Sequence, residues 1–272
     1  MIGSPIGHSL SPMIQNAALR AAGLDYVYVA LPASPYALDS VVYGLRDAGV
    51  VGFNVTIPFK TEMIHLMNDL SDDARHVQAV NTVVIQRDSR LVGHNTDVMG
   101  FLAGFAERDV VLAGKSAVMI GAGGAARAAL LQSHVSSVVI GVRNPAKGAA
   151  LCKDFAANGD VRALSFDDPA FISALGAADI VVQTTPLGMM PHVEEMPPVD
   201  ITAMKPSAVV YDLIYTPAET RFLREAAARG HVTINGETML VAQGAEAFFL
   251  WTGVRPDTAL MKRVLREELA RR

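Results

Sequence analysis

Four short polar stretches in the first hundred residues carry side chains that can act on a small molecule. They are residues 8–12, 54–60, 79–82 and 93–97. Each is expected to end a strand or start a helix, and ligands of parallel α/β sheets bind beyond the carboxyl ends of strands. If these loops share one edge of a sheet, they form a single pocket of hydroxyls, amides, one amine (Lys60) and one carboxylate (Asp97).

A second candidate site lies at a glycine-rich turn between an apolar strand and a helix. Gly121, Gly123 and Ala126 take the first, third and sixth places of the dinucleotide fingerprint. The first glycine permits a tight turn, the second lets the backbone approach a pyrophosphate, and the small third residue lets helix and strand pack closely. The helix N-terminus would favour the phosphates. The residues expected to contact a dinucleotide here are Gly121, Ala122, Gly123, Gly124 and Ala125.

The type of dinucleotide depends on the residue that follows the next strand, near residues 137–142. NAD-binding chains usually place Asp or Glu about 20 residues after the first glycine, where it binds the ribose. This chain has Val142-Arg143-Asn144 and no acid there. A guanidinium can bind a 2′-phosphate through paired hydrogen bonds, so Arg143 favours NADP. Alternatively, Arg143 is an ordinary solvated loop residue, and NAD stays possible.

Composition excludes several other classes of function. The chain has 272 residues, 51% of them apolar, which suffices for a large core and two domains. A net charge of −4 gives no reason to expect a nucleic-acid partner. The sequence contains no apolar run long enough for a membrane span, and Cys152 is the single cysteine. We therefore expect a cytoplasmic protein with a small-molecule ligand and no metal, nucleic acid or membrane partner.

The pattern along the chain predicts an α/β protein. In the first hundred residues we expect a helix capped by Ser11, strands near 26–31 and 50–56, helices near 37–48 and 59–67, and a hairpin formed by 79–86 and 90–95. Alternation of this kind predicts a mainly parallel sheet. After a connecting helix near 99–113, six strands fit a doubly wound Rossmann sheet, near 116–121, 137–142, 161–164, 179–183, 208–212 and 231–234.

The last third of the chain is expected to be mainly helical. A helix following Tyr215 should have Thr216 as its cap, Pro217 as its first residue and Gly230 at its end. Two further helices are expected near 237–251 and 256–270.

Seven motifs stand in a fixed order along the chain. They are Gly-Ser-Pro-Ile-Gly-His-Ser-Leu-Ser-Pro (3–12), Asn-Val-Thr-Ile-Pro-Phe-Lys (54–60), Ala-Val-Asn-Thr (79–82), Asn-Thr-Asp (95–97), Gly-Ala-Gly-Gly-Ala-Ala-Arg (121–127), Asp-Leu-Ile-Tyr (212–215) and Met-Leu-Val-Ala-Gln (239–243). Together they resemble the shikimate dehydrogenase family over essentially the whole chain. The resemblance implies NADPH-dependent reduction of 3-dehydroshikimate to shikimate, a step of chorismate and aromatic amino acid biosynthesis. It also implies a substrate domain, residues 1–105 with 237–272, and a Rossmann NAD(P)-binding domain, residues 106–236.

The resemblance assigns Lys60 and Asp97 as the catalytic pair. Taken alone, Lys60 fits a surface helix lysine better than a catalytic one, and Asp97 fits a helix N-cap better; the joint match of the seven motifs favours the catalytic roles. Oxidation of a secondary alcohol needs a group that handles the hydroxyl proton, and Lys60 can hydrogen-bond the reacting oxygen. A neighbouring carboxylate stabilises the protonated amine, so Asp97 fits a role in orienting Lys60 and holding a substrate hydroxyl. Which of the two moves the proton stays open.

The remaining assignments follow from the same resemblance. Ser9 and Ser11 match serines that bind the substrate carboxylate, and Tyr215 matches a residue close to it. Thr56, Asn81 and Gln243 match residues that bind the ring hydroxyls; the amide of Gln243, in an otherwise apolar helix, needs a partner. Residues expected to shape the nicotinamide site are Thr185, Leu213, Gly236 and Met239, although Met239 could simply belong to the core.

Three departures from the family pattern keep alternatives open. Val142 and Asn144 replace the polar neighbours that many NADP-using members have beside the arginine. The run Gln-Thr-Thr-Pro-Leu-Gly-Met at 183–189 resembles quinate/shikimate branches, so a catabolic quinate/shikimate dehydrogenase is an alternative. Relatives also have more residues before the serine motif, and we expect a longer product to have a higher thermal midpoint. A non-catalytic dinucleotide-sensing regulator is a third possibility, although it would not need both Lys60 and Asp97. A monomer and a homodimer are both compatible with the sequence.

Overall fold

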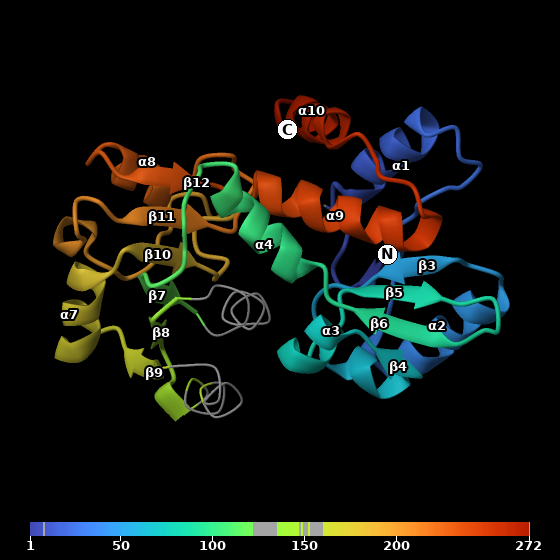
Figure 1. Cartoon of the computed structure of the whole chain (residues 1–272), viewed down its shortest axis with the longest axis horizontal. Helices are drawn as coiled ribbons and strands as arrows, with labels where there is room; N and C mark the ends of the chain where they lie inside the picture. The colour runs from blue at the N-terminus through green and yellow to red at the C-terminus, as the bar shows by residue number, and fades with distance from the viewer. Residues whose placement is uncertain (8, 122–134, 147, 149–151, 153–159, 272) are drawn as a thin grey trace. The chain divides into compact units, whose positions relative to one another are not determined.

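The computed structural model describes residues 1–7, 9–121, 135–146, 148, 152 and 160–271 (Figure 1). The chain divides into two compact units, one formed by Met1–Gly100 with Val241–Arg272 and the other by Phe101–Leu240. The backbone passes from the first unit to the second within α4 (Asp97–Ala106) and returns within α9 (Glu237–Thr252).

A six-stranded parallel sheet forms the centre of the unit Phe101–Leu240. Its strands are β7 (Ser116–Ile120), β8 (Ser137–Val142), β9 (Asp160–Ser165), β10 (Ile180–Gln183), β11 (Val209–Asp212) and β12 (Val232–Ile234). They lie in the order β12-β11-β10-β7-β8-β9, with every neighbouring pair parallel. This is the doubly wound order: successive strands are added on one side of β7 as far as β9, and then on its other side from β10 onward. The predicted α/β fold and all six predicted strands are confirmed.

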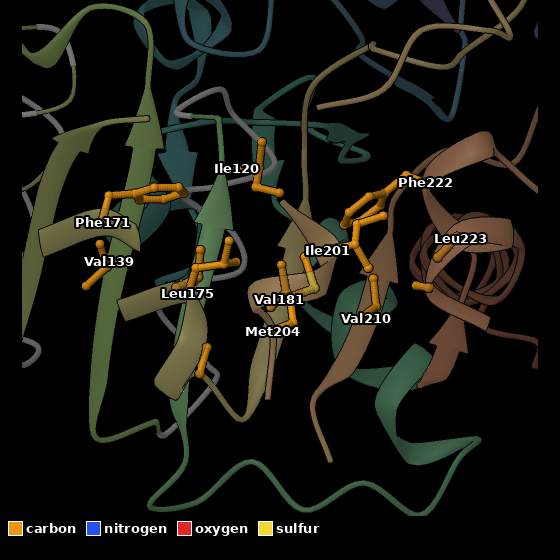
Figure 2. Packing of buried hydrophobic residues seen from close by; sticks show 13 residues of the cluster. Ile120, Val139, Phe171, Leu175, Val181, Ile201, Met204, Val210, Phe222 and Leu223 are labelled. Carbon is orange, nitrogen blue, oxygen red and sulfur yellow. The ribbon is translucent and has the colours of Figure 1, made fainter. Parts of the chain in front are cut away.

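Alternate residues of these strands pack on opposite faces of the sheet, as the two-residue period of a strand requires. Ala117 and Met119 belong to one buried cluster with Phe101 and Phe105 of α4 on one face. Val118 and Ile120 lie on the other face, where α7 (Pro169–Ala177) and α8 (Arg221–Ala227) cover them (Figure 2). Both faces are apolar because both are covered, which explains the nearly continuous apolar runs in the sequence.

The unit that contains both chain ends has a smaller sheet. β3 (Gly52–Asn54), β5 (Thr82–Ile85), β6 (Leu91–His94) and β4 (Asp69–Leu70) lie in the order β3-β5-β6-β4. The pair β4-β6 is parallel, and β1 (Ile2–Gly3) pairs in parallel with β2 (Leu31–Pro32) and, through Ile2, with Val55. The predicted hairpin is present as the antiparallel pair β5-β6, and β3 is antiparallel to β5. The four-stranded sheet is therefore mixed, and the expectation of a mainly parallel sheet in this unit is wrong, because the short turn between β5 and β6 permits only antiparallel pairing.

Helices complete this unit. They are α1 (Ser11–Ala21), the 3₁₀ helix η1 (Pro35–Ala37), α2 (Leu38–Asp47), the 3₁₀ helix η2 (Glu62–Leu66), α3 (Asp72–Val77) and α10 (Thr258–Leu269). Phe59 and Met63 are fully buried beside Val42 of α2 and Val83 of β5, so the core lies between the helices and the sheet. None of the helices in the described part of the chain is long and apolar enough to span a membrane.

Two predicted elements of this unit are wrong in extent. Residues 26–31 do not form a full strand, because the side chain of Asn16 binds both the N–H and the carbonyl of Tyr28 at 2.8 and 2.7 Å. The predicted helix 59–67 is reduced to η2. The carbonyl of Lys60, which an α-helix would use internally, accepts instead from the N–H of Val80 at 2.7 Å.

Helix boundaries also differ from the predictions at two caps. Ser11 is the first residue of α1 rather than its cap, and its N–H is bound by the hydroxyl of Ser9 at 3.3 Å. The helix expected after Tyr215 starts at Arg221 with Thr220 as its cap, not Thr216. The connecting helix spans Asp97–Ala106, which is earlier than 99–113.

The short helix α3 was not predicted, although its signal was present. Ser71 caps it by accepting from the N–H of Ala74 at 3.3 Å, and Asp72 and Asp73 follow in its first turn. A capping serine followed by acidic residues is a typical helix start.

Candidate active site

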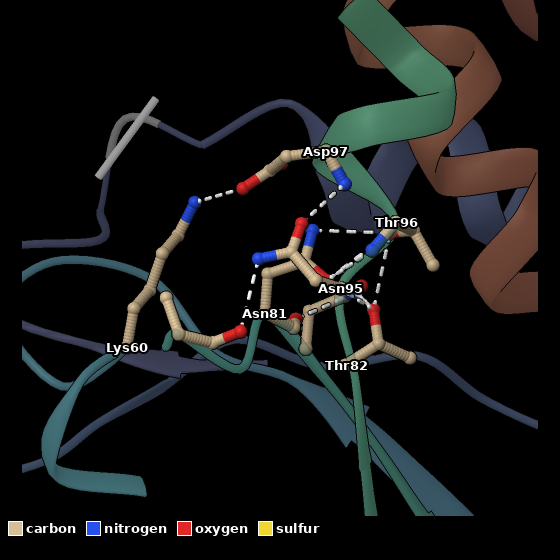
Figure 3. A network of polar contacts seen from close by, with 8 residues as sticks. Lys60, Asn81, Thr82, Asn95, Thr96 and Asp97 are labelled. Carbon is tan, nitrogen blue, oxygen red and sulfur yellow. Dashed lines mark hydrogen bonds and ion pairs between the residues drawn. The ribbon is translucent and has the colours of Figure 1, made fainter. Parts of the chain in front are cut away.

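Lys60 and Asp97 form an ion pair in the unit that contains the chain ends. Lys60 Nζ lies 2.6 Å from Asp97 Oδ2, and the side chains are 23% and 10% exposed (Figure 3). A contact of this length is a charge-assisted hydrogen bond. The pair therefore combines a proton donor and an acceptor that are partly screened from water, yet still accessible.

The position of Asp97 is set by the start of α4. Asp97 is the first residue of this helix, where a negative charge is favoured by the helix dipole. Its N–H donates to Asn95 Oδ1 at 3.1 Å, and Asn95 Nδ2 in turn donates to the carbonyl of Ala79 at 3.0 Å. Asn95 thus fixes the helix start to the segment that precedes β5.

Asn81 is held by Thr96, the residue before Asp97. The N–H of Thr96 donates to Asn81 Oδ1 at 2.8 Å, and Asn81 Nδ2 donates to Thr96 Oγ1 at 3.0 Å (Figure 3). Because a backbone N–H can only donate, the amide orientation of Asn81 is fixed. Asn81 is 2% exposed and its position is therefore coupled directly to that of the Lys60–Asp97 pair.

A second row of buried polar residues supports Asn81. Thr82 Oγ1 donates to Asn81 Oδ1 at 3.0 Å and accepts from Asn54 Nδ2 at 2.9 Å. Tyr28 donates its hydroxyl proton to Asn54 Oδ1 at 2.6 Å, and burial raises the pKa of Tyr28, which keeps the hydroxyl protonated. Sequence reasoning assigned no role to Tyr28, because in an apolar run it is indistinguishable from a core residue.

The other candidate substrate residues of this unit are Ser9, Ser11, Thr56 and Gln243. Ser9 Oγ donates to Met1 Sδ at 3.2 Å. The N–H of Thr56 donates to the carbonyl of Ile2 at 3.0 Å, and Gln243 lies half-buried on α9. Within the described residues, no hydrogen bond joins Ser9, Ser11 or Thr56 to the Lys60–Asp97 network. Their assignment as ligands stays a prediction.

The glycine turn after β7 begins in a backbone conformation that only glycine adopts readily. Gly121 has φ of +103°, and a Cβ atom built on it would lie 2.6 Å from Thr185 Cγ2. Thr184 Oγ1 donates to the carbonyl of Ile120 at 2.8 Å, which joins the ends of β7 and β10. A tight turn that requires glycine at this position is the start of the dinucleotide fingerprint, so Gly121 fits that ligand. The predicted contacts Ala122, Gly123, Gly124 and Ala125 lie outside the described residues.

Leu213 and Gly236 are brought together at the ends of β11 and β12. A Cβ on Gly236 would lie 2.0 Å from the carbonyl oxygen of Leu213, so only glycine fits there. Arg143 is exposed directly after β8. Met239 packs against the core cluster around Phe101, as the alternative reading of that residue predicted. Tyr215 lies in the segment between β11 and α8, and is partly buried.

Known proteins match this chain over nearly its full length. The model of the shikimate dehydrogenase substrate binding domain matches residues 1–83, and that of the shikimate 5′-dehydrogenase C-terminal domain matches residues 236–266. The shikimate dehydrogenase (NADP(+)) of Geobacter metallireducens is 44% identical over 97% of this chain and 93% of that protein. The chain belongs to the shikimate dehydrogenase family.

Solved structures of the family agree with this membership. A crystal structure of shikimate dehydrogenase in complex with NADP+ superposes with a TM-score of 0.92 at 39% identity, covering 98% of this chain and 94% of that one. The enzyme from Listeria monocytogenes in complex with shikimate and NAD gives a TM-score of 0.90 at 33% identity, with 97% and 94% covered. The resemblance expected from the seven motifs is therefore confirmed.

Proposed function

We propose that this chain interconverts 3-dehydroshikimate and shikimate by hydride transfer with NADP(H). The single observation that carries the proposal within the structure is the 2.6 Å contact between Lys60 Nζ and Asp97 Oδ2. Membership of the shikimate dehydrogenase family supplies the substrate class. A regulator that only senses a dinucleotide would have no need for a lysine and a carboxylate held in this way.

The nicotinamide of bound NADPH supplies the hydride, and the protein must supply a proton to the oxygen that becomes a hydroxyl. Lys60 is the group that hydrogen-bonds this oxygen and protonates it, in general-acid catalysis. Asp97 accepts from Lys60 Nζ and so fixes the direction in which the ammonium points. Its other oxygen can hold a neighbouring substrate hydroxyl.

We assign binding of the substrate to polar side chains other than Lys60 and Asp97. Asn81 is hydrogen-bonded to Thr96, the residue before Asp97, and we assign it to a ring hydroxyl together with Thr56 and Gln243. Ser9 and Ser11 would bind the carboxylate through their hydroxyls, with Tyr215 close to it. Quinate carries an additional hydroxyl on the carbon that bears the carboxylate, so Ser9, Ser11 and Tyr215 would also decide between shikimate and quinate.

Gly121 to Ala125 would hold the pyrophosphate of NADP, and Thr185, Leu213, Gly236 and Met239 would surround the nicotinamide. We assign Arg143, which is exposed after β8, to the 2′-phosphate. Replacing Arg143 by alanine should raise KM for NADP about tenfold, because one charge-assisted interaction is lost. KM for NAD, which has no 2′-phosphate, should change less than twofold. Equal changes in KM for NADP and NAD would mean that Arg143 does not bind the 2′-phosphate.

A steady-state assay of NAD(P)H formation tests the proposed function. Shikimate and quinate are each offered with NADP and with NAD. The proposal expects the highest kcat/KM for shikimate with NADP. A preference for quinate would favour the catabolic alternative, and no turnover with any of the four pairs would favour the regulator. We also propose a cytoplasmic location, and a monomer or homodimer, which subcellular fractionation and size-exclusion chromatography would test.

A further inference from the structure

Asp212 is a fully buried carboxyl group that the proposed reaction does not use. It is the last residue of β11 and has no exposed surface. Its Oδ1 accepts from the N–H of Ile214 at 3.0 Å, and its Oδ2 accepts from the hydroxyl of Thr220 at 2.7 Å. Within the described part of the chain, no cation is paired with it. Because a buried carboxyl is costly without a compensating partner, its two hydrogen bonds must matter to the local structure.

These two hydrogen bonds connect both ends of the segment between β11 and α8. Ile214 lies at the start of this segment and Thr220 at its end. Thr220 is itself 1% exposed and caps α8, since its Oγ1 accepts from the N–H of Leu223 at 3.3 Å. One carboxyl group therefore links the end of a strand, the first turn of the segment and the start of a helix.

The start of the segment is also held from two other strands. The N–H of Leu213 donates to the carbonyl of Gln183 in β10 at 3.1 Å. The N–H of Gly236, which follows β12, donates to the carbonyl of Ile214 at 2.9 Å. The strands thus hold Leu213 and Ile214. Farther along the segment, the carbonyl of Thr216 accepts from the N–H of Met190 at 3.0 Å and that of Ala218 accepts from Asn235 Nδ2 at 2.9 Å. Asp212 adds a link that joins the two ends of the segment to each other, through Ile214 and Thr220.

We propose that Asp212 and Thr220 form a clamp that positions residues 213–220, and with them Leu213 and Tyr215, for ligand binding. The proposal rests on the proposed function, because the ligand roles of Leu213 and Tyr215 belong to it. Asp212 and Thr220 are positioning residues here: they act through the segment and do not touch a ligand.

Thr220 can keep the clamp closed in both protonation states of the carboxyl. Burial raises the pKa of Asp212 to about 7. When the Asp212 carboxyl is protonated, its proton lies on Oδ2, because Oδ1 accepts from the N–H of Ile214, which can only donate. A hydroxyl group both donates and accepts, and Thr220 can therefore accept from a protonated Oδ2 without losing its cap to Leu223. Valine at this position would have the same shape without either hydrogen bond.

Variants of Thr220 separate a positioning role from a merely structural one. Thr220→Val removes the hydroxyl, whereas Thr220→Ser keeps it. As a matched control, Asp168→Ala removes the cap of α7, which accepts from the N–H of Ala170 at 2.8 Å and lies outside the segment. We expect Thr220→Val to raise KM for shikimate and the dissociation constant of NADPH about tenfold, with Thr220→Ser within twofold of the wild type. Asp168→Ala should lower the thermal midpoint and leave both constants unchanged.

The dissociation constant is measured by NADPH fluorescence, and hydrogen exchange of the Ile214 amide is followed without any turnover. If the wild type has no shikimate activity, the proposed function fails, but these two measurements still test the clamp. Should Thr220→Val only lower the thermal midpoint, with Ile214 exchange and NADPH binding unchanged, the positioning role is wrong. If Thr220→Val does not fold, Asp212→Asn against Asp212→Ala serves instead, since only asparagine can keep both hydrogen bonds.

The raised pKa also predicts how stability depends on pH. A carboxyl whose pKa is 3.8 in the unfolded chain and about 7 in the folded one stabilises the fold fully below pH 3.8. That stabilisation is lost progressively up to a pH of about 7, because the unfolded chain ionises this carboxyl while the folded protein must keep the proton on it. The free energy of unfolding of the wild type should therefore fall between about pH 4 and pH 7 relative to that of Asp212→Asn. Urea unfolding measures both free energies. If those of the wild type and of Asp212→Asn changed with pH by the same amount across this range, the assignment of the raised pKa to Asp212 would be wrong.

Discussion

Replacing Lys60 by alanine is expected to reduce kcat at least about 100-fold, the loss typical of a missing acid–base group. Lys60 Nζ is held by Asp97 and lies at the accessible side of a polar network that is otherwise buried. Alanine leaves the reacting oxygen without its proton donor. Affinity for NADPH should change little, because the candidate cofactor residues belong to the other unit. Steady-state kinetics and an NADPH fluorescence titration measure the two quantities separately.

Lys205 provides a matched control for this variant. Lys205 Nζ forms an ion pair of similar length with Asp179, 2.5 Å, at the surface of the other unit. Lys205→Ala removes the same number of atoms and the same charge, and should leave kcat within twofold. A Lys60→Ala enzyme with the kcat of the wild type would refute the role of Lys60 in the reaction.

Replacing Asp97 by asparagine is expected to reduce kcat by about 100-fold as well, for a different reason. Asparagine keeps the size of the side chain and the N–H that donates to Asn95. It removes the charge that holds Lys60 Nζ at 2.6 Å, so the ammonium can leave its productive position. A misplacement of about 1 Å at a reacting group is enough for a loss of this size.

Asp72 is the matched control for Asp97, because it is likewise the first residue of a helix but is exposed. Asp72→Asn should leave kcat unchanged. The double variant Lys60→Ala/Asp97→Asn tests whether the pair acts as a unit: its loss in kcat should be close to that of Lys60→Ala alone, since Asp97 acts through Lys60. Losses that multiply would mean that the two residues work independently.

The sequence predicted the Rossmann sheet well because the signal for each strand is local. Strands such as β8 and β10 are short runs of β-branched residues between turn residues, and they must be apolar on both faces. The glycine at position 121 is likewise a local requirement, since its φ of +103° excludes other residues. The seven motifs identified the family for the same reason: each is a short string whose spacing is fixed along the chain.

The start of α8 and the backbone of residues 26–31 could not be predicted, because each depends on a hydrogen bond to a side chain several positions away in the chain. Thr216 and Thr220 are equally good caps in sequence, and the choice of Thr220 depends on Asp212, which lies eight residues away and is buried beside it. The apolar run at 26–31 resembles a strand, yet the side chain of Asn16 in α1 occupies the backbone groups of Tyr28. In both places a side-chain hydrogen bond between residues several positions apart outweighs the local preference for a cap or a strand.

By itself, the sequence determined which residue types are available for the reaction, the order of the Rossmann strands along the chain and the family. Only the tertiary structure decided that Lys60 and Asp97, 37 residues apart, meet at 2.6 Å. The hairpin β5-β6 lies between them in the chain and joins the end of β6 to the start of α4. The physical reason is that strand pairing and the buried amides of Asn81 and Asn95, rather than any local preference, fix where these two side chains lie.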